Sequence, residues 1–324
     1  YAQRTRDEWD EIPSGTDLII NLLPQFDVTQ APDGAFTVAW VRNWVDRWLE
    51  NPSFRYYNLA VASTEVFANA IDASSEVDTA VLPLATNPDR FRPTDSDVAL
   101  EADYTFTGSF WGKGRELERY LDVRPNETFT IFGKGWDRRP RGQRYWRGHL
   151  EYDRLPTLYS SVKIVLDDTV EPNLPAVNSR VFDALATGTL VLSDNAAGSD
   201  EWFDGLLPIY TNRVELREQL DKYLTDDAAR TDLAARLREI VLERHTYQKR
   251  AEQVIHAIHE HIDKPSISIR IGPPAWDVAE QWGDTHFARH FARALRSEGW
   301  STRISVVPAW DDFRHQDVDV VLHI

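Results

Sequence analysis

The sequence predicts an α/β fold with two Rossmann-like domains, each built on a doubly wound parallel sheet. Three observations support this prediction. Short apolar runs of strand length alternate with helical patterns along most of the chain, which is typical of parallel sheets. The length of 324 residues suits about two domains. A polar segment containing Pro83, Pro88 and Pro93 interrupts the pattern and has the composition of a linker.

The elements are expected in the following order. In the first domain, strands are expected at residues 17–23, 36–40, 58–63 and 79–84. In the second, strands are expected at residues 104–108, 128–132, 163–167, 189–193 and 208–210, with helices at 115–121, 155–160 and 179–186. A long amphipathic stretch at residues 213–261 closes this domain, with leucine and isoleucine at helical spacing.

The last 60 or so residues begin a new strand–helix–strand pattern, so we divide the chain at residues 1–97, 98–262 and 263–324. Strands are expected at 266–271, 301–307 and 318–324, and a helix at 285–299. Residues 319–324 resemble the first strand at 17–23. The final segment therefore either opens a further tandem module or completes the first domain as a circular permutation. Exchange of residues 263–324 in a homodimer gives the same geometry.

Composition excludes several classes of function. The net charge of −16 argues against general affinity for nucleic acid, which requires a basic surface. There is no cysteine, so disulfides, thiolate metal ligands and a cysteine nucleophile are excluded. No apolar run approaches the ~20 residues of a membrane span, and no signal-peptide pattern is present. A cytoplasmic protein is expected.

Residues 171–194 carry the strongest local signal. A loop leads into a helix at Asn178 or Ser179, and the helix ends at Gly188 before a buried strand. The start of a helix offers free backbone N–H groups and a positive dipole end, which suit a diphosphate. Arg180 is placed to contact phosphate, and Asp183, one turn later, to accept ribose hydroxyls. The alternative is an ordinary capped helix with a surface arginine.

This stretch resembles the nucleotide-sugar motif of group 1 glycosyltransferases of the GT-B type, and is most similar to the spore-maturation-protein-like branch. That motif reads roughly Asn-x-Arg-x-Phe-Glu/Asp-Ala-x-Ala-x-Gly, and Asn178 to Gly188 follows it. Four further segments match in the same order. They are residues 104–111 with Arg115, residues 131–136, residues 145–160, and residues 245–250. The resemblance covers about residues 17–262.

The resemblance implies a nucleotide-diphosphate sugar as donor, a hexosyltransferase-type activity and no cofactor. It implies donor contacts from Asn178, Ser179, Arg180 and Asp183, with phosphate contacts from Gly108, Ser109 and Gly133. Arg115 and Lys134 are the implied catalytic cations of this domain, because positive groups stabilise the leaving diphosphate. No metal is expected; the nearest approach to an Asp-x-Asp metal motif, at Asp167 and Asp168, follows a strand.

One departure from the family concerns stereochemistry. Many retaining relatives have two glutamates eight residues apart, but here Pro175 stands eight positions before Asp183. Either Glu171, which lies four positions before Pro175, takes the role of the first glutamate, or this chain has no residue in that role. Retention of the anomeric configuration is therefore only weakly indicated.

Acceptor contacts are expected from two other places. Residues 272–287 resemble the first loop of the family's N-terminal domain, where Asp284 or His286 would act as the base toward an acceptor hydroxyl; the alternative is a capped helix with a solvated histidine. Trp40, Arg42 and Trp44 follow a strand and would stack against a sugar, or the aromatic residues close the core. The spacing of His256, His259 and His261 is more typical of a polar helix surface than of a metal site.

The leading hypothesis is an enzyme that transfers a sugar from a nucleotide donor to a glycan or another hydroxyl acceptor. The alternative is a non-catalytic nucleotide- or glycan-binding module. An epimerase or dehydrogenase is disfavoured, since no Gly-x-Gly-x-x-Gly follows the first strand of either domain.

Overall fold

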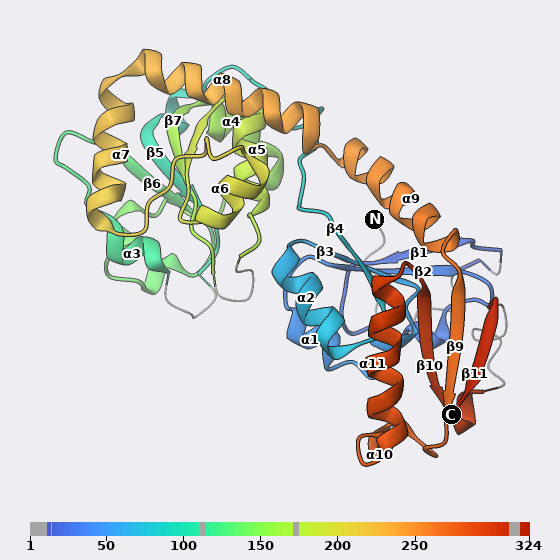
Figure 1. The fold of residues 1–324 in the computed structure, drawn as a ribbon. Helices are drawn as coiled ribbons and strands as arrows, with labels where there is room; N and C mark the ends of the chain where they lie inside the picture. Colours follow the sequence, from blue (N-terminus) through green and yellow to red (C-terminus); the bar gives the residue numbers. More distant parts are fainter. Residues whose placement is uncertain (1–11, 14, 111–114, 171–174, 311–317) are drawn as a thin grey trace. The chain divides into compact units, whose positions relative to one another are not determined.

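The computed structural model describes residues 12–13, 15–110, 115–170, 175–310 and 318–324 (Figure 1). The chain divides into two compact units. The first unit contains residues 1–82 and 252–324, and the second contains residues 83–251. The polar segment expected as a linker thus belongs largely to the second unit, and the final segment belongs to the first.

The described strands are β1 (Leu18–Asn21), β2 (Phe36–Val41), β3 (Leu59–Ala62), β4 (Asp78–Val81), β5 (Ala102–Thr107), β6 (Phe129–Phe132), β7 (Val162–Leu166), β8 (Leu190–Leu192), β9 (Ser266–Ile271), β10 (Ser301–Val306) and β11 (Val320–His323). The described α-helices are α1 (Val45–Leu49), α2 (Glu65–Ser74), α3 (Glu116–Tyr120), α4 (Leu155–Ser160), α5 (Ser179–Ala186), α6 (Ala196–Trp202), α7 (Arg213–Thr225), α8 (Asp227–Arg244), α9 (Tyr247–Ile262), α10 (Trp276–Ala279) and α11 (Gly283–Ser297).

The first unit contains a parallel sheet in the order β1-β2-β3-β4. All four residues of β3 are buried and apolar, as expected for a parallel strand covered on both faces. Helix α9 covers one face, where Val254 and Ile258 pack in one apolar cluster with Val38 and Val61. The predicted strands of the first domain are therefore present in the predicted order.

The final segment folds into a second parallel sheet of the same unit, in the order β10-β9-β11. Ala288 and Ala292 of α11 pack against Ile269 and Ile304 of this sheet. Within the described residues, these strands pair only with one another, so they do not extend the sheet of β1 to β4. At the end of α9, His261 Nδ1 lies 2.9 Å from the carboxylate of Asp78 on β4.

The second unit contains a parallel sheet in the order β6-β5-β7-β8. The chain moves from β5 to β6 on one side and then returns to β7 on the other side of β5. This reversal is the topological switch point of a doubly wound sheet, and it lies between β5 and β7. The predicted fold of this domain is confirmed.

One predicted strand of the second unit is absent as a strand, and the predicted amphipathic stretch is divided into separate helices. Residues 208–210 form only an isolated bridge, in which Ser193 pairs with Ile209. Pro208 has no N–H to donate, which limits the pairing. The stretch at 213–261 is three helices, α7 to α9, because the Asp226 side chain caps the start of α8 and His245 follows its end.

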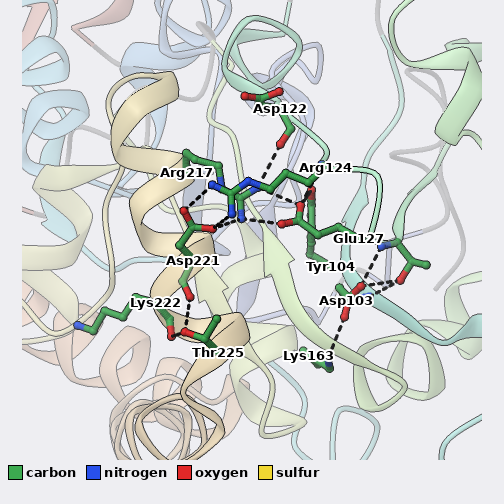
Figure 2. Close-up of polar contacts among 11 residues, drawn as sticks. Asp103, Tyr104, Asp122, Arg124, Glu127, Lys163, Arg217, Asp221, Lys222 and Thr225 are labelled. Atoms are coloured by element: carbon green, nitrogen blue, oxygen red, sulfur yellow. Dashed lines mark hydrogen bonds and ion pairs between the residues drawn. The ribbon is translucent and has the colours of Figure 1, made fainter.

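A polar network at the amino ends of β5 and β6 attaches α7 to the sheet (Figure 2). Arg217 contacts both Glu127 and Asp221 at 2.9 Å. The Tyr104 hydroxyl donates to Glu127 at 2.9 Å, and Arg124 binds both oxygens of Asp221. This network lies at the edge of the sheet opposite the carboxyl ends of its strands, so it fixes the helix without approaching the switch point.

Among the described residues, the helices are too short or too polar to cross a membrane.

Candidate functional site

The loops after β5, β6 and β7 meet at the switch point of the second unit. Ligands of open α/β sheets bind beyond the carboxyl ends of the strands at such a point. The loop after β5 begins with Gly108 and Ser109, the loop after β6 with Gly133 and Lys134, and the loop after β7 with Asp167. The predicted phosphate-binding segments are therefore neighbours.

Gly108 and Gly133 are required by the packing of the first two loops. A Cβ atom on Gly133 would lie 2.2 Å from the carbonyl oxygen of Gly108, and the φ angle of Gly133 is +149°. The indole N–H groups of Trp136 and Trp146 donate at 2.7 Å to the carbonyls of Gly108 and Gly133 respectively. The two glycines thus bring two backbones into contact, which is a structural role in addition to the predicted one.

Ser109 and Lys134 continue this contact. The backbone N–H of Lys134 donates to Ser109 Oγ at 3.2 Å, and the N–H of Phe110 donates to the carbonyl of Lys134 at 2.7 Å. The Lys134 side chain is exposed. Its backbone is therefore fixed while its ammonium group remains accessible to an anion.

Helix α5 begins beside these loops, as the sequence predicts. Asn178 has an extended backbone, and its side-chain oxygen accepts the N–H of Arg180 at 3.1 Å. This is an ordinary N-cap. The N–H of Val181 donates to the carbonyl of Asn178 at 3.0 Å, so among the described contacts of the first turn the N–H of Ser179 is the one left at the start of this helix of eight residues.

Arg180 is buried at the switch point rather than free at the surface. Its Nη1 lies 2.5 Å from Asp167 Oδ1, and its Nε donates to the carbonyl of Thr107. The guanidinium also lies 4.5 Å from the ring centre of Phe106. Arg180 therefore connects the ends of β5 and β7, and its charge is balanced within the protein.

Arg115 is arranged in the same way. Its Nη1 lies 2.5 Å from Asp168 Oδ1, and its Nη2 donates to the carbonyl of Ser109 at 2.7 Å. Only 5% of its side chain is exposed. Both arginines predicted to bind phosphate therefore have a buried aspartate as partner, which the sequence reasoning did not anticipate.

Asp183 lies on the buried side of α5. Its Oδ1 accepts the hydroxyl of Thr86 at 2.7 Å, and Thr86 is held by a backbone bridge to Thr246. Burial raises the pKa of Asp183 to about 7, against the smaller opposing effects of Thr86 and Arg90. The carboxyl group predicted to bind ribose is thus largely desolvated and partly protonated near neutral pH.

Sequence reasoning missed a third acidic position beside Asp167 and Asp168. Ser193 follows β8 and donates to Asp167 Oδ2 at 3.0 Å. The next residue, Asp194, accepts the backbone N–H of Thr169 with both carboxylate oxygens, at 2.9 and 3.1 Å. Burial, and then the charges of Asp167 and Asp168, raise the pKa of Asp194 to about 7. The available signal was an aspartate within two residues of the end of each of two adjacent buried strands, at Asp167 and Asp194.

The residues predicted to contact the acceptor all lie in the first unit. Asp284 is in the first turn of α11, and its Oδ2 would lie 4.0 Å from a Cβ atom on Gly272, in the loop after β9. Trp282, not Asp284 or Thr285, is the N-cap of this helix. The exposed ring of His286 contacts the carbonyl of Glu280 through Nε2 at 3.0 Å.

The tryptophans after β2 have different environments. Trp40 is partly buried and packs against the core of the sheet of β1 to β4. This agrees with the alternative in which the aromatic residues close the core. Trp44 has a φ of 56°, unusual for a bulky residue, and precedes α1. The Arg47 guanidinium lies 3.8 Å from the Trp44 ring centre. Arg42, which lies between Trp40 and Trp44 in the sequence, donates through Nη2 to the carbonyl of Leu22 at 3.4 Å.

The histidines of α9 do not come together. His261 pairs with Asp78, and His256 lies 3.3 Å from Glu260 on the helix surface. Within the described part of the chain, no three His, Asp or Glu side chains form a group that could hold a metal ion. Glu171, whose role was left open, lies outside the described residues.

Comparisons with known proteins agree with this geometry. Residues 114–256 match a family model described as glycosyl transferase-like. This segment begins next to Arg115 and ends in α9, so it includes α5 and the aspartates after β7 and β8. No curated protein matches the sequence significantly.

Several solved structures have a similar fold at low sequence identity. The Anabaena protein HepE in complex with UDP and glucose is 15% identical, with a TM-score of 0.60, and the match covers 75% of this chain and 77% of HepE. Sucrose-phosphate synthase from Thermosynechococcus elongatus is 14% identical (TM-score 0.58; 76% and 74% covered). A glycosyltransferase from Rickettsia africae is also 14% identical (TM-score 0.57; 76% and 77% covered). The chain therefore has the GT-B fold of two Rossmann-like domains.

Proposed function

We propose that this protein is a hexosyltransferase that moves a sugar from a nucleotide-diphosphate donor to a glycan or another hydroxyl acceptor. The observation that carries the proposal is the start of α5 at the switch point of the second unit, inside the segment that matches a glycosyl transferase-like family. That HepE was solved with UDP and glucose supports a nucleotide-sugar donor here.

In this proposal the diphosphate lies against the loops of Gly108, Ser109 and Gly133 and the first turn of α5. Lys134 supplies the accessible positive charge, and the helix start supplies the N–H of Ser179 and the positive end of its dipole. Arg115 and Arg180 each pair with an aspartate and orient these loops. Their other N–H groups donate hydrogen bonds to the phosphates. Lys134 and the helix start can supply the positive charge that the leaving diphosphate needs, so we propose that transfer requires no metal ion.

The ribose is proposed to bind at Asp183, the acidic residue on the helix that carries Arg180. The acceptor is proposed to contact the first unit, with Asp284 or His286 as the base and Trp40, Arg42 and Trp44 as weaker contacts. Asp284 is the better supported base, because His286 already contacts the Glu280 carbonyl.

The test is release of nucleoside diphosphate from a panel of UDP-, GDP- and ADP-sugars, compared between the native protein and Lys134→Ala. We expect one donor to be turned over and the variant to lose about 100-fold in rate, as when one group that stabilises developing negative charge is removed. The melting temperature should not change, because the Lys134 side chain is exposed.

Lys163→Ala is the matched control. Lys163 is also partly exposed, and it pairs with Asp103 at the amino ends of the strands, away from the proposed site. Activity equal to the native value is expected for this variant. Equal activity of Lys134→Ala would instead contradict the proposed role of Lys134, and no turnover of any donor would contradict the proposed enzyme.

The same assay addresses the alternative function. A non-catalytic binding module would be stabilised by a nucleoside diphosphate in a thermal-shift measurement yet release no product from any sugar nucleotide. One observation supports a binding module. Arg115 and Arg180, the two arginines predicted to bind phosphate, are both buried in ion pairs.

A further inference from the structure

The carboxyl ends of β7 and β8 hold more negative than positive charge. Three aspartates, Asp167, Asp168 and Asp194, lie here with the two guanidinium groups of Arg115 and Arg180. Asp167 is fully used, because one oxygen pairs with Arg180 and the other accepts from Ser193. Asp168, in contrast, has an oxygen without a hydrogen-bond partner within the described protein.

Asp168 has one free acceptor in a buried position. Its Oδ1 pairs with Arg115, but its Oδ2 is buried and has no hydrogen-bond partner among the described residues. The residue as a whole is 1% exposed. A buried acceptor without a donor destabilises a protein, and such a group in a native structure is a place where a water molecule, an ion or a ligand hydroxyl can bind.

The neighbouring residue shows the same feature. The Oγ1 of Thr169 is buried without a partner in the described part of the chain, and Thr169 is 7% exposed. Its backbone N–H is bound by both oxygens of Asp194. Asp194 is only partly buried. Of these three neighbouring residues, Asp168 and Thr169 are therefore in the interior and Asp194 is accessible to solvent.

We propose that Asp168, Thr169 and Asp194 form the subsite that binds the hydroxyl groups of the donor's sugar ring. This inference rests on the proposed function and names the part of the donor that these residues recognise. Carboxylate oxygens accept hydrogen bonds from sugar hydroxyls, and the threonine hydroxyl both donates and accepts.

The charge balance selects a neutral polyol over other ligands. A phosphate placed against Asp168 and Asp194 would meet their carboxyl groups and that of Asp167, so its binding there is unfavourable; the proposed diphosphate lies instead against the loops after β5 and β6 and the start of α5. The pKa of Asp194 is raised to about 7 by burial and by Asp167 and Asp168. A hydroxyl donor would relieve this excess of acceptors.

The main experiment is isothermal titration of the native protein and Thr169→Val with UDP and UDP-glucose, GDP and GDP-mannose, and ADP and ADP-glucose. Valine keeps the shape of threonine and removes only the hydroxyl group. We expect affinity for the sugar nucleotide to fall about fivefold, the value of one hydrogen bond, and affinity for its nucleoside diphosphate to change less than twofold. The melting temperature of the ligand-free protein should rise, since an unpaired buried group is removed.

A matched control is Thr302→Val in the first unit. Thr302 also has a buried hydroxyl oxygen without a partner in the described residues, so its melting temperature should rise similarly while both affinities stay unchanged. Asp168→Asn is the second variant at the subsite. It keeps an oxygen for Arg115 but replaces the free acceptor with an amide, and we expect about a tenfold loss for the sugar nucleotide. The loss for the nucleoside diphosphate should be smaller, and it arises because Arg115 loses its charged partner.

The outcomes separate this inference from the proposed function. If a sugar nucleotide binds and Thr169→Val alters neither affinity, or weakens both equally, the sugar subsite is wrong while the donor site stands. If the native protein binds none of the six nucleotides, the proposed function fails, and the subsite fails with it.

Discussion

Arg180 and Asp167 form an ion pair across the switch point of the second unit, with 2.5 Å between Nη1 and Oδ1. The same guanidinium donates to the carbonyl of Thr107 at the end of β5, while Asp167 follows β7. The sequence motif placed Arg180 at the start of a helix, where it was expected to meet phosphate. In the structure it first joins the two strands between which a doubly wound sheet opens.

We expect Arg180→Ala to destabilise the second unit by about 3–5 kcal/mol, because Asp167 would remain buried without its charged partner. Hydrogen exchange of peptides covering β7 and α5 would measure this effect, with faster exchange in both. The double variant Arg180→Met with Asp167→Leu should recover most of the loss, since an apolar pair needs no charge balance. If Arg180→Ala lowers nucleotide affinity without faster exchange, its main role is ligand contact rather than positioning.

Asp183→Asn is expected to stabilise the protein at neutral pH and to weaken nucleotide binding. The pKa of Asp183 rises from its ordinary value of 3.8 to about 7 on folding. The folded state therefore binds the proton more tightly, and stability falls as pH rises from about 4 to 7. Asparagine has no charge to bury, and its oxygen still accepts from Thr86.

Thermal unfolding at pH 4.5 and pH 7.5 measures the effect of Asp183→Asn on stability. The melting temperature of Asp183→Asn should exceed the native value by several degrees at pH 7.5 and by much less at pH 4.5, because most of the pH-dependent loss lies between these two values. Titration with the nucleoside diphosphate that the native protein binds measures the effect on nucleotide binding. We expect the affinity to fall at least tenfold. Unchanged affinity would remove Asp183 from the ribose site, whatever its effect on stability.

Much of this fold was predictable because its signals are local. Helix α4 has the predicted bounds of 155–160, since proline in its first turn and a following apolar strand mark both ends. Asn178 was predictable as a cap from its type and its position before the helix. Buried parallel strands such as β7 are short apolar runs and were found within one residue.

The contacts of the site were not predictable because they join distant parts of the chain. Thr86 reaches Asp183 across 97 positions, and no local pattern records that pairing. The arginines were interpreted as ligands because arginine binds phosphate well. The same geometry serves carboxylates equally, and only the packed structure shows that Asp167 and Asp168 are their partners.

His245 is expected to make the protein sensitive to acid. Its Nδ1 accepts from Arg250 at 2.6 Å and its Nε2 contacts the carbonyl of Trp202 at 3.0 Å. Burial, followed by the charge of Arg250, lowers the pKa of His245 from 6.5 to about 4. The unfolded state therefore binds a proton more readily, and stability is lost as pH falls from 6.5 toward 4.

Comparison with His245→Gln isolates this effect, because Asp183 and the other titrating groups are common to both proteins. The advantage in unfolding free energy of the native protein over the variant should shrink by up to about 3 kcal/mol between pH 7 and pH 4, at about 1.4 kcal/mol per pKa unit. Denaturant unfolding at several pH values measures it. An advantage that is constant with pH would show that His245 titrates normally.

Arg217→Met is expected to destabilise the second unit without altering nucleotide binding. Arg217 is 13% exposed and contacts Glu127 and Asp221 at 2.9 Å (Figure 2). Its loss leaves the buried Glu127 with the Tyr104 hydroxyl as its closest remaining donor. We expect a loss of about 2 kcal/mol, the magnitude of hydrogen bonds to charged groups.

Arg213→Met on the same helix is the matched control, since Arg213 pairs with Asp122 in an exposed position. Exposed ion pairs contribute less than about 1 kcal/mol, so this variant should unfold close to the native midpoint. Both variants should bind the nucleoside diphosphate with native affinity, because α7 meets the sheet at the amino ends of its strands. Weaker binding by Arg217→Met at a temperature where it remains folded would mean that the two edges of this sheet are coupled, and that the site extends beyond the switch point.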